Sequence, residues 1–511
     1  MAVDVVVIGA GQNGLAAAVR LADAKKKVVV VEARDRVGGL CSKEEFHPGY
    51  FVPGMLHDTG LVRSEVLDAL GLGKKVGQRD DPGTFVPGPE GGLVLSKDAA
   101  ATKKEIARRS AKDVEGYATY RGFFDRVKSF LRDVANAPPD PLSPTSKAEL
   151  WSLGKRGLAL RRLGKEDMVE ILRVAPMCVA DWLNEFFETP ELVEALAAPA
   201  VVGSFLGPWS AGSAANLLMA EGTSEKYLAG GPPALVSALH ERAKSLGVEV
   251  RLSSRVTRIR VEDDRVIGVT LSSGEDIECR SVAASCDPKQ TILELIHPSA
   301  LPVRFEDQVR AVRARGTTAK VHVALSGPLS FDARPEILFE SARLGGGHVD
   351  ALERAFDAVK YGRFSERPQL EIRVPTVADP TLAPAGHHVA SILVSFAPHD
   401  LRQGWSDATR SALGERVLQT LEASSKGVRE KIVATEVLTP KDLSTRYGLS
   451  GGHLFHVEPA LDQLLFMRPT ASAARYATPI KGLFLAGSGS HPGGGVSAAP
   501  GLLAAETMLR E

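Results

Sequence analysis

The sequence predicts a mixed α/β protein in which one parallel-sheet domain is assembled from three separated segments. An almost unbroken β-branched run at Val3–Ile8 leads directly into a glycine-rich turn and a helical pattern. Short β patterns then crowd residues 248–283, and a strand pattern at 482–487 leads into a second glycine cluster. Continuous apolar runs of this length are typical of strands buried on both faces.

The first turn has the spacing of a dinucleotide-binding fingerprint. Gly9, Gly11 and Gly14 form a GxGxxG motif between the first strand pattern and a helical pattern over 15–24. Gly9 permits a tight turn, Gly11 lets the backbone approach a pyrophosphate, and Gly14 lets the helix pack on the strand. The helix N-terminus adds free N–H groups for phosphate. We therefore expect a Rossmann-type βαβ unit.

The second strand, 28–31, ends on Glu32, eighteen residues beyond Gly14. A carboxylate there can accept hydrogen bonds from an adenosine ribose and would repel a 2′-phosphate, which disfavours NADP. An arginine-containing extension with a glycine pair follows, and it resembles the extension of FAD-containing oxidases and desaturases. The resemblance implies FAD rather than NAD. Its expected cofactor-binding residues are Ala33, Arg34, Arg36, Gly38 and Gly39.

Composition excludes several classes of protein. The chain has 511 residues, enough for two or three domains, and 62 basic residues balance 62 acidic ones, so no nucleic-acid partner is expected. Its four cysteines form no CxxC pair, which argues against a dithiol centre and a zinc ribbon. The first strand leaves no room for a signal peptide, and no apolar run is long enough for a spanning helix. We expect a cytoplasmic protein.

The remaining patterns divide the chain. Residues 230–300 open with Gly230-Gly231-Pro232-Pro233 and a helical pattern over 234–245, followed by four β patterns. This part resembles the segment that completes the FAD domain of two-dinucleotide-fold flavoproteins, where the backbone at Val256 meets adenine. The expected domains are an FAD-binding domain (1–75, 230–300 and 470–511), a mostly helical substrate or lid region (76–229) and a substrate-domain sheet (301–469).

The second glycine cluster is expected at the flavin. Glycines after a strand let backbone N–H groups approach a flat ligand without a β-carbon in the way. We expect a helix from Val496 to Leu509, whose dipole at Gly495-Val496 would stabilise negative charge on the flavin. The expected flavin-binding residues of this segment are Gly487, Ser488, Gly494, Gly495 and Val496.

The segment 485–496 resembles the C-terminal flavin motif of bacterial phytoene desaturases. Four further stretches, at 199–208, 379–386, 451–456 and 462–469, look closest to the pyridine nucleotide-disulphide oxidoreductase domain-containing protein 2 group. The likeness covers almost the whole chain. Two departures stand out, because relatives usually have a glycine–glycine–methionine–glycine turn at 230–233 and amine oxidases a glycine–glutamate pair at 487–488.

Few polar residues are candidates for chemistry. His57, His456 and His491 lie in segments expected near the flavin, although a structural role is the more frequent one for any single histidine. His453 and His456 have an HxxH spacing without a third ligand, so no metal is expected. Hydride transfer needs mainly positioning and a flavin, so a catalytic triad is not required.

The predicted function is that of an FAD-dependent oxidoreductase that desaturates or oxidises an apolar, isoprenoid- or lipid-like substrate by hydride transfer to flavin N5. The alternatives are a flavin amine oxidase, which the 6% aromatic content disfavours, and a flavoprotein scaffold with little turnover. A basic and apolar stretch at 150–163 could contact a membrane surface and admit the substrate, but we favour a solvated helix face packed on the core. The substrate, the electron acceptor and the oligomeric state are not specified.

Overall fold

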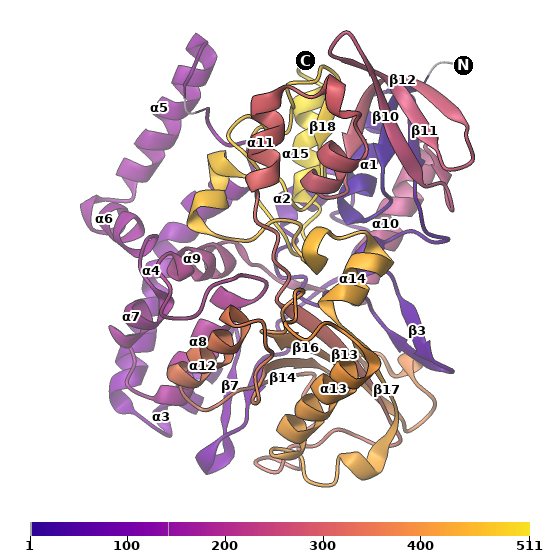
Figure 1. The fold of residues 1–511 in the computed structure, drawn as a ribbon. Coiled ribbons are helices and arrows are strands. Elements are labelled where there is room, and N and C mark those ends of the chain that lie inside the picture. The colour runs from indigo at the N-terminus through magenta and orange to yellow at the C-terminus, as the bar shows by residue number, and fades with distance from the viewer. Residues whose placement is uncertain (1–2, 142) are drawn as a thin grey trace.

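The structure is a computed structural model, and it describes residues 3–141 and 143–511. Two sheets lie at opposite ends of the molecule, and a group of helices runs along one side between them (Figure 1).

The first sheet joins three distant parts of the chain. Its parallel part has the order β9-β2-β1-β12-β18, and β12 continues into an antiparallel meander with β11 and β10. The expected discontinuous Rossmann-type domain is therefore confirmed. The bounds are β1 (Val3–Ile8), β2 (Val28–Val31), β9 (Glu249–Arg251), β10 (Val256–Glu262), β11 (Arg265–Leu271), β12 (Asp276–Ala284) and β18 (Leu483–Leu485).

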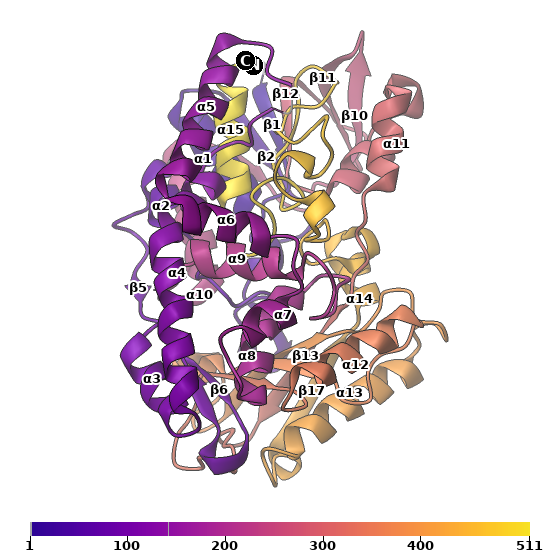
Figure 2. The same cartoon turned by 90° about the vertical axis from the view of Figure 1, so that its left-hand side faces the viewer.

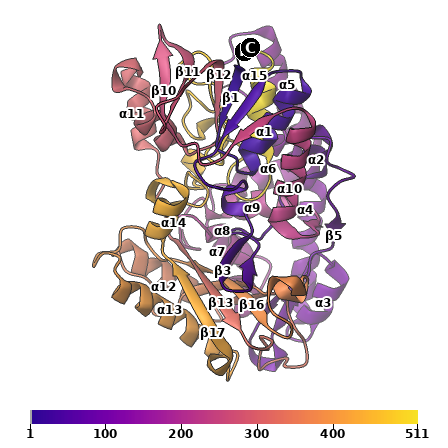
Figure 3. The ribbon, with the colours of Figure 1, turned by 90° about the vertical axis from the view of Figure 1, so that its right-hand side faces the viewer.

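Both faces of this sheet are covered, which explains its continuous apolar strands. Val5, Val7 and Val30 pack against one layer of helices (Figure 3). These helices are α1 (Gln12–Asp23), α10 (Gly231–Ser245) and α15 (Ala499–Met508). On the other face, Val6 and Val29 pack toward the β10–β11 hairpin and α11 (Val303–Ala311).

Helix α15 begins at Ala499, so the helix start that the sequence predicts at Val496 is wrong. Gly493, Gly495 and Ala498 have φ angles of 125°, 98° and 58°. A right-handed helix needs negative φ, so these residues keep the preceding segment irregular. The residues before α15 form a loop, called here the C-terminal loop (487–498).

The second sheet has the order β17-β13-β16-β15-β14-β6-β7. Its apolar face packs against α13 (Asp407–Glu422). Strands β6 and β7 reach this sheet from the segment before the helical region, through a parallel contact of β6 with β14. The bounds are β6 (Thr84–Val86), β7 (Leu93–Leu95), β13 (Thr318–Leu325), β14 (Ser341–Leu344), β15 (Gln369–Arg373), β16 (His388–Ser395) and β17 (Ile432–Leu438).

The helical region faces the viewer in Figure 2. It has its own aromatic core, in which Tyr120, Phe124 and Trp182 are fully buried. Its helices are α3 (Ala99–Ala107), α4 (Ala111–Ala135), α5 (Lys147–Arg162), α6 (Lys165–Val174), α7 (Val179–Asn184), α8 (Pro190–Val201) and α9 (Ser213–Thr223). The remaining elements are α2 (Ser64–Ala69), α12 (Val349–Lys360), α14 (Pro440–Tyr447) and the strand pairs β3 (Glu44–His47) with β4 (Tyr50–Val52) and β5 (Gln78–Arg79) with β8 (Tyr227–Leu228).

Helix α5 stands apart from both sheets in Figure 1 and has no buried residue. Leu150 and Trp151 are 61% and 68% exposed. The favoured expectation of a solvated helix face holds in part, because most of α5 is solvated and the partly buried Leu160 packs against the core of the helical region. Among the residues described, no helix combines the length and the apolar character needed to cross a membrane.

Candidate functional site

A cavity of about 180 Å³ lies at the carboxyl ends of β1 and β2, where parallel sheets of this type bind dinucleotides. It gathers most of the residues expected at the cofactor from segments far apart in the chain. The expected residues that line it are Gly9, Gly11, Glu32, Ala33, Arg34, Gly38, Gly39, Val256 and Ser488.

The three fingerprint glycines have different surroundings. A β-carbon placed on Gly11 would meet no atom within 4 Å, so the space over this residue is open to a ligand. A β-carbon on Gly14 would lie 1.9 Å from the carbonyl oxygen of Gly9, and Gly9 itself has a φ of 95°. Gly11 therefore leaves room for a phosphate, whereas Gly14 is required for the contact of α1 with the turn.

The Glu32 carboxylate is buried at the cavity wall, with 8% of the residue exposed. Its Oε2 accepts a hydrogen bond from the Ala10 N–H (2.7 Å), and its Oε1 accepts one from the Arg34 N–H (2.9 Å). Each carboxylate oxygen keeps a further lone pair. The two backbone bonds fix the carboxylate and leave it able to accept from ribose hydroxyls.

The two arginines of the extension differ. Arg34 lines the cavity, donates to Glu44 Oε1 (2.6 Å) and lies 4.9 Å from the centre of the Tyr447 ring. Arg36 is exposed, pairs with Asp35 (2.9 Å) and does not line the cavity. Gly487 does not line the cavity either. It packs against the backbone, where a β-carbon would lie 2.6 Å from the Ser285 carbonyl oxygen.

Two residues of the fingerprint tie it to the C-terminal loop. Gln12 Nε2 donates to the Gly495 carbonyl (2.7 Å), and Gln12 Oε1 accepts from the Ser497 N–H (2.9 Å). Asn13 Nδ2 donates to Ser488 Oγ (3.0 Å), while Asn13 Oδ1 is buried without a partner. Sequence reasoning missed both residues, because the variable positions of GxGxxG accept many side chains and give no indication of this contact.

A second cavity, of about 1100 Å³, adjoins the first, and Leu56 lines both. Its C-terminal wall contains Gly494, Gly495 and Val496, which sequence reasoning assigned to the flavin. A β-carbon on Gly494 would lie 2.2 Å from Phe455 Cβ. Neighbouring side chains therefore already require glycine at that position.

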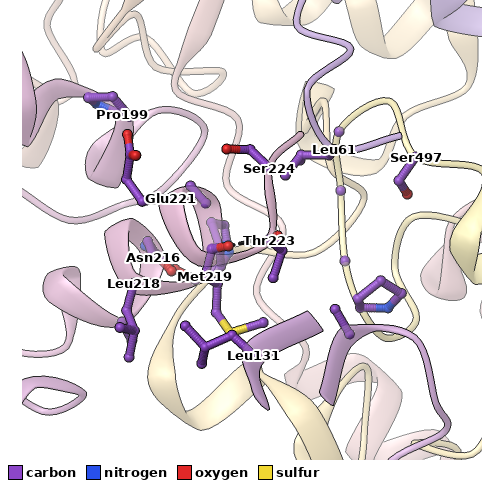
Figure 4. Close-up of a pocket in the computed structure, with 18 of the residues that line it drawn as sticks. Leu61, Leu131, Pro199, Asn216, Leu218, Met219, Glu221, Thr223, Ser224 and Ser497 are labelled. Atoms are coloured by element: carbon purple, nitrogen blue, oxygen red, sulfur yellow. Dashed lines mark hydrogen bonds between the residues drawn. The ribbon is translucent and has the colours of Figure 1, made fainter. Parts of the chain in front are cut away.

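The wall facing this loop is mostly apolar and comes from the helical region. Figure 4 shows Leu61 and Ser497 on one side of the cavity and Leu131, Leu218 and Met219 on the other. Helix α9 contributes several of these side chains, and α5 contributes Leu153 and Leu160. We call this space the large cavity.

His57 lines the large cavity and begins a chain of hydrogen bonds. Its Nε2 lies 2.8 Å from Ser391 Oγ, which lies 2.9 Å from His322 Nδ1. Burial, together with the nearby Lys320, holds the pKa of His57 well below its usual value. The ring is therefore neutral near pH 7 and serves as a hydrogen-bonding group.

The other two candidate histidines have different surroundings. His491 lines the large cavity and donates from Nε2 to the Val134 carbonyl (2.9 Å), and burial lowers its pKa to about 3. His456 lines the dinucleotide cavity, has a φ of 64° and has a buried Nδ1 without a partner. The structure thus brings His57 and His491 together at the large cavity and places His456 beside the dinucleotide cavity.

The comparisons with known proteins agree with this geometry. Residues 92–509 match the family model "Flavin containing amine oxidoreductase", and residues 7–62 match "NAD(P)-binding Rossmann-like domain". The chain belongs to the flavin-containing amine oxidoreductase family. The open space over Gly11, the fixed carboxylate of Glu32 and the unpartnered Asn13 Oδ1 fit its cofactor, FAD.

Relatives and solved structures cover nearly the whole flavoprotein. It is 32% identical to pyridine nucleotide-disulfide oxidoreductase domain-containing protein 2 of Mus musculus, with 99% of this chain and 93% of the relative covered. It is 28% identical to the neurosporene-forming phytoene desaturase of Cereibacter sphaeroides, with the same coverage. The resemblance to both groups is therefore confirmed.

Two solved structures show the same fold. An oxidoreductase from Methanosarcina mazei aligns with a TM-score of 0.64 at 16% identity, covering 99% of this chain and 100% of that structure. Putrescine oxidase with bound putrescine aligns with a TM-score of 0.60 at 18% identity, covering both chains fully.

Proposed function

We propose that this flavin oxidoreductase desaturates or otherwise oxidises an isoprenoid- or lipid-like substrate by hydride transfer to flavin N5. The large cavity carries this proposal: it has about 1100 Å³, is lined mostly by apolar side chains, and extends from the C-terminal loop into the helical region. Cavities with this lining bind apolar ligands by excluding water. The desaturase relative acts, by its name, on the isoprenoid phytoene.

The protein's residues would position the substrate and exclude water from the site. FAD, when bound, supplies the two-electron acceptor. Gln12 and Asn13 hold the C-terminal loop against the fingerprint, so the wall beside the reacting carbon is fixed. Leu131 and Met219 exclude water from the opposite side. His57 is held by Ser391 and can orient a polar group of the substrate through a hydrogen bond.

An amine oxidase is the second candidate, because the carboxylates of Asp58, Asp81 and Glu221 line the same cavity and could hold an ammonium group. Each already has a partner. Asp58 accepts from the Gly60 N–H (2.8 Å), Asp81 from the Gly83 N–H (3.0 Å), and Glu221 pairs with Arg121 (2.8 Å). We therefore place the amine second.

Anaerobic flavin bleaching tests the proposal. The purified holoprotein is mixed with phytoene, squalene or a long-chain unsaturated carboxylic acid in detergent micelles, and with putrescine or dodecylamine, and the flavin absorbance is followed. We expect the isoprenoid or the unsaturated acid to bleach the flavin. Bleaching by an amine alone would favour the second candidate, and no bleaching by either class would contradict the proposed substrate class.

We also propose that α5 rests on an anionic lipid surface. The helix carries five basic residues against one acid, and Trp151 and Leu150 are exposed on it. Cationic helices with exposed tryptophan and leucine bind anionic interfaces. Leu153 and Leu160 of this helix also line the large cavity, so a lipid at α5 would lie next to the substrate space.

Vesicle sedimentation tests this contact. The protein should bind vesicles of phosphatidylcholine with phosphatidylglycerol and bind pure phosphatidylcholine less. Changing both Leu150 and Trp151 to serine should abolish binding to the vesicles. Tyr361→Ser is the control and should leave binding unchanged, because it removes an aromatic side chain that is 65% exposed but lies outside α5. If α5 instead contacts a second copy, light scattering will show a dimer that the double variant loses, and the lipid proposal fails.

A further inference from the structure

The face of the second sheet that turns toward the large cavity is polar, although it is buried. One cross-strand row contains Lys320, Glu371 and Arg343, and the next contains His322, Ser391 and Arg373. The residues between them along the strands, such as Val321 and Ile372, form the apolar core on the other face. The large cavity therefore has an apolar helical side and a polar floor.

Two cations of this floor have no anionic partner. Lys320 is 1% exposed and lines the cavity, and its ammonium makes no hydrogen bond or ion pair with any residue that the structure describes. Arg373 lies 5.8 Å from the centre of the Tyr227 ring and, within the same part of the chain, has no ion pair. Burial lowers its pKa, but Tyr227, Asp58 and Glu371 together raise the pKa above its usual value, so this charge is only partly balanced. A buried charge without a close anionic partner is costly, so both residues point to an anionic ligand.

The acidic residues of the cavity offset these charges only in part, through Glu371 and, for Arg373, Asp58. Glu371, the acid nearest to them in the sheet, pairs with Arg343 (2.9 Å). The carboxylates of Asp58, Asp81 and Glu221 are bound as described above. Eight Lys and Arg residues and five Asp and Glu residues line the cavity, so its formal net charge is positive.

We propose that the substrate is amphipathic, with a carboxylate that Lys320 and Arg373 hold at the polar floor and an apolar chain that extends along the helical wall. This inference rests on the proposed function and specifies its substrate class. Guanidinium and ammonium groups bind carboxylates through charge-assisted hydrogen bonds, which are the strong ones in a site without water. His57 lies at the same floor as both cations. A bound head group would therefore set the position of the substrate's apolar chain relative to the C-terminal loop.

A binding titration tests the head group without turnover. Dodecanoate, dodecan-1-ol and dodecylamine are added to the oxidised holoprotein, and binding is read from the change in the visible flavin spectrum and from the unfolding temperature. Dodecanoate should bind at least about tenfold more tightly than the alcohol, since a hydrogen bond to a charged group contributes tenfold or more. Equal affinities, or tighter binding of the amine, would overturn the proposal.

Variants locate the effect. Arg373→Gln and Lys320→Met should each lower the affinity for dodecanoate by about tenfold or more and leave the affinity for dodecan-1-ol unchanged. Arg373→Lys and Lys320→Arg should keep most of the preference. Equal losses for both ligands, or no loss, would overturn the assignment. If a variant fails to fold, the wild-type ranking still decides. The three probes have saturated hydrocarbon chains, and the titration measures their binding and not their oxidation. A failure of isoprenoids to bleach the flavin would therefore not change the outcome of this titration.

Discussion

The Glu32 carboxylate accepts a 2.7 Å hydrogen bond from the backbone N–H of Ala10, inside the turn that the fingerprint glycines form. This bond joins the end of the second strand to the glycine turn that follows the first. The carboxylate therefore helps to shape the cavity at this end of the sheet.

Replacing Glu32 should remove the flavin. Glu32→Ala loses two backbone hydrogen bonds and the ribose acceptors, and each bond to a charged group contributes about 1.5–3 kcal/mol. Asp35→Ala is the matched control, because Asp35 is exposed and pairs only with Arg36. The ratio of flavin to protein absorbance after dialysis should fall in the first variant alone. Equal retention in both would contradict the ribose assignment.

The fingerprint glycines predict two separable defects. Gly11→Ala adds a methyl group to open space, so the apoprotein should keep its unfolding temperature but lose FAD. Gly14→Ala places a methyl group 1.9 Å from the Gly9 carbonyl oxygen, so the apoprotein itself should be destabilised, by about 1–3 kcal/mol or more. Thermal unfolding of both apoproteins, together with their flavin content, checks this. A Gly11→Ala variant that binds FAD normally would show that the phosphates lie elsewhere.

Much of the cofactor domain could be predicted because its elements are local. The β patterns at 255–261 and 266–271 match β10 and β11 closely, since each is bounded by turn residues that act on their neighbours. The start of α15 could not be predicted, because the positive φ of Ala498 depends on contacts such as that of Gln12 with its N–H. The pairing of β6 with β14 is also long-range and leaves no local pattern.

The polar floor of the large cavity shows a similar limit. Residues 318–325 alternate between polar and apolar side chains as far as His322, which indicates a strand with two different faces. That pattern is typical of a solvated face. Segments from elsewhere in the chain bury this face: Lys320 lies at the large cavity and the His322 ring packs on Phe46 of β3, and this packing is not encoded in the strand itself.

Breaking the hydrogen bond between His57 and Ser391 should slow flavin reduction. Ser391→Ala removes the hydroxyl that joins His57 to His322, at a cost of about 1 kcal/mol, or roughly fivefold in rate. Ser395→Ala on the same strand is the control, because Ser395 Oγ has no partner in the structure. Stopped-flow reduction with a bleaching substrate measures both. Equal rates for the two variants would remove His57 from the reaction.

The burial of Lys320 should make the stability of the folded protein depend on pH. Burial lowers its pKa to about 7 in the folded state, from an unfolded value near 10.5. Between these values the unfolded chain binds more protons, so the free energy of unfolding should rise with pH, by up to about 1.4 kcal/mol per pH unit. The neighbouring charged and titratable groups are His57, His322, Glu371 and Arg373.

Denaturant unfolding of the wild type and Lys320→Met at pH 7, 8 and 9 isolates this contribution. The variant should be at least as stable as the wild type at pH 7, and its advantage should shrink as the pH rises. A variant that is less stable at pH 7 would show that Lys320 is charged and well paired in the fold.

The central claim is that this flavoprotein removes hydrogen from a largely apolar substrate. The most direct measurement is an anaerobic single turnover, in which the holoprotein is incubated with phytoene and, separately, with long-chain unsaturated carboxylic acids, and the recovered compounds are weighed by mass spectrometry. We expect a product that has lost two hydrogen atoms, in an amount equal to the flavin that is reduced. Flavin reduced only by amines, or substrates recovered with unchanged mass, would contradict it.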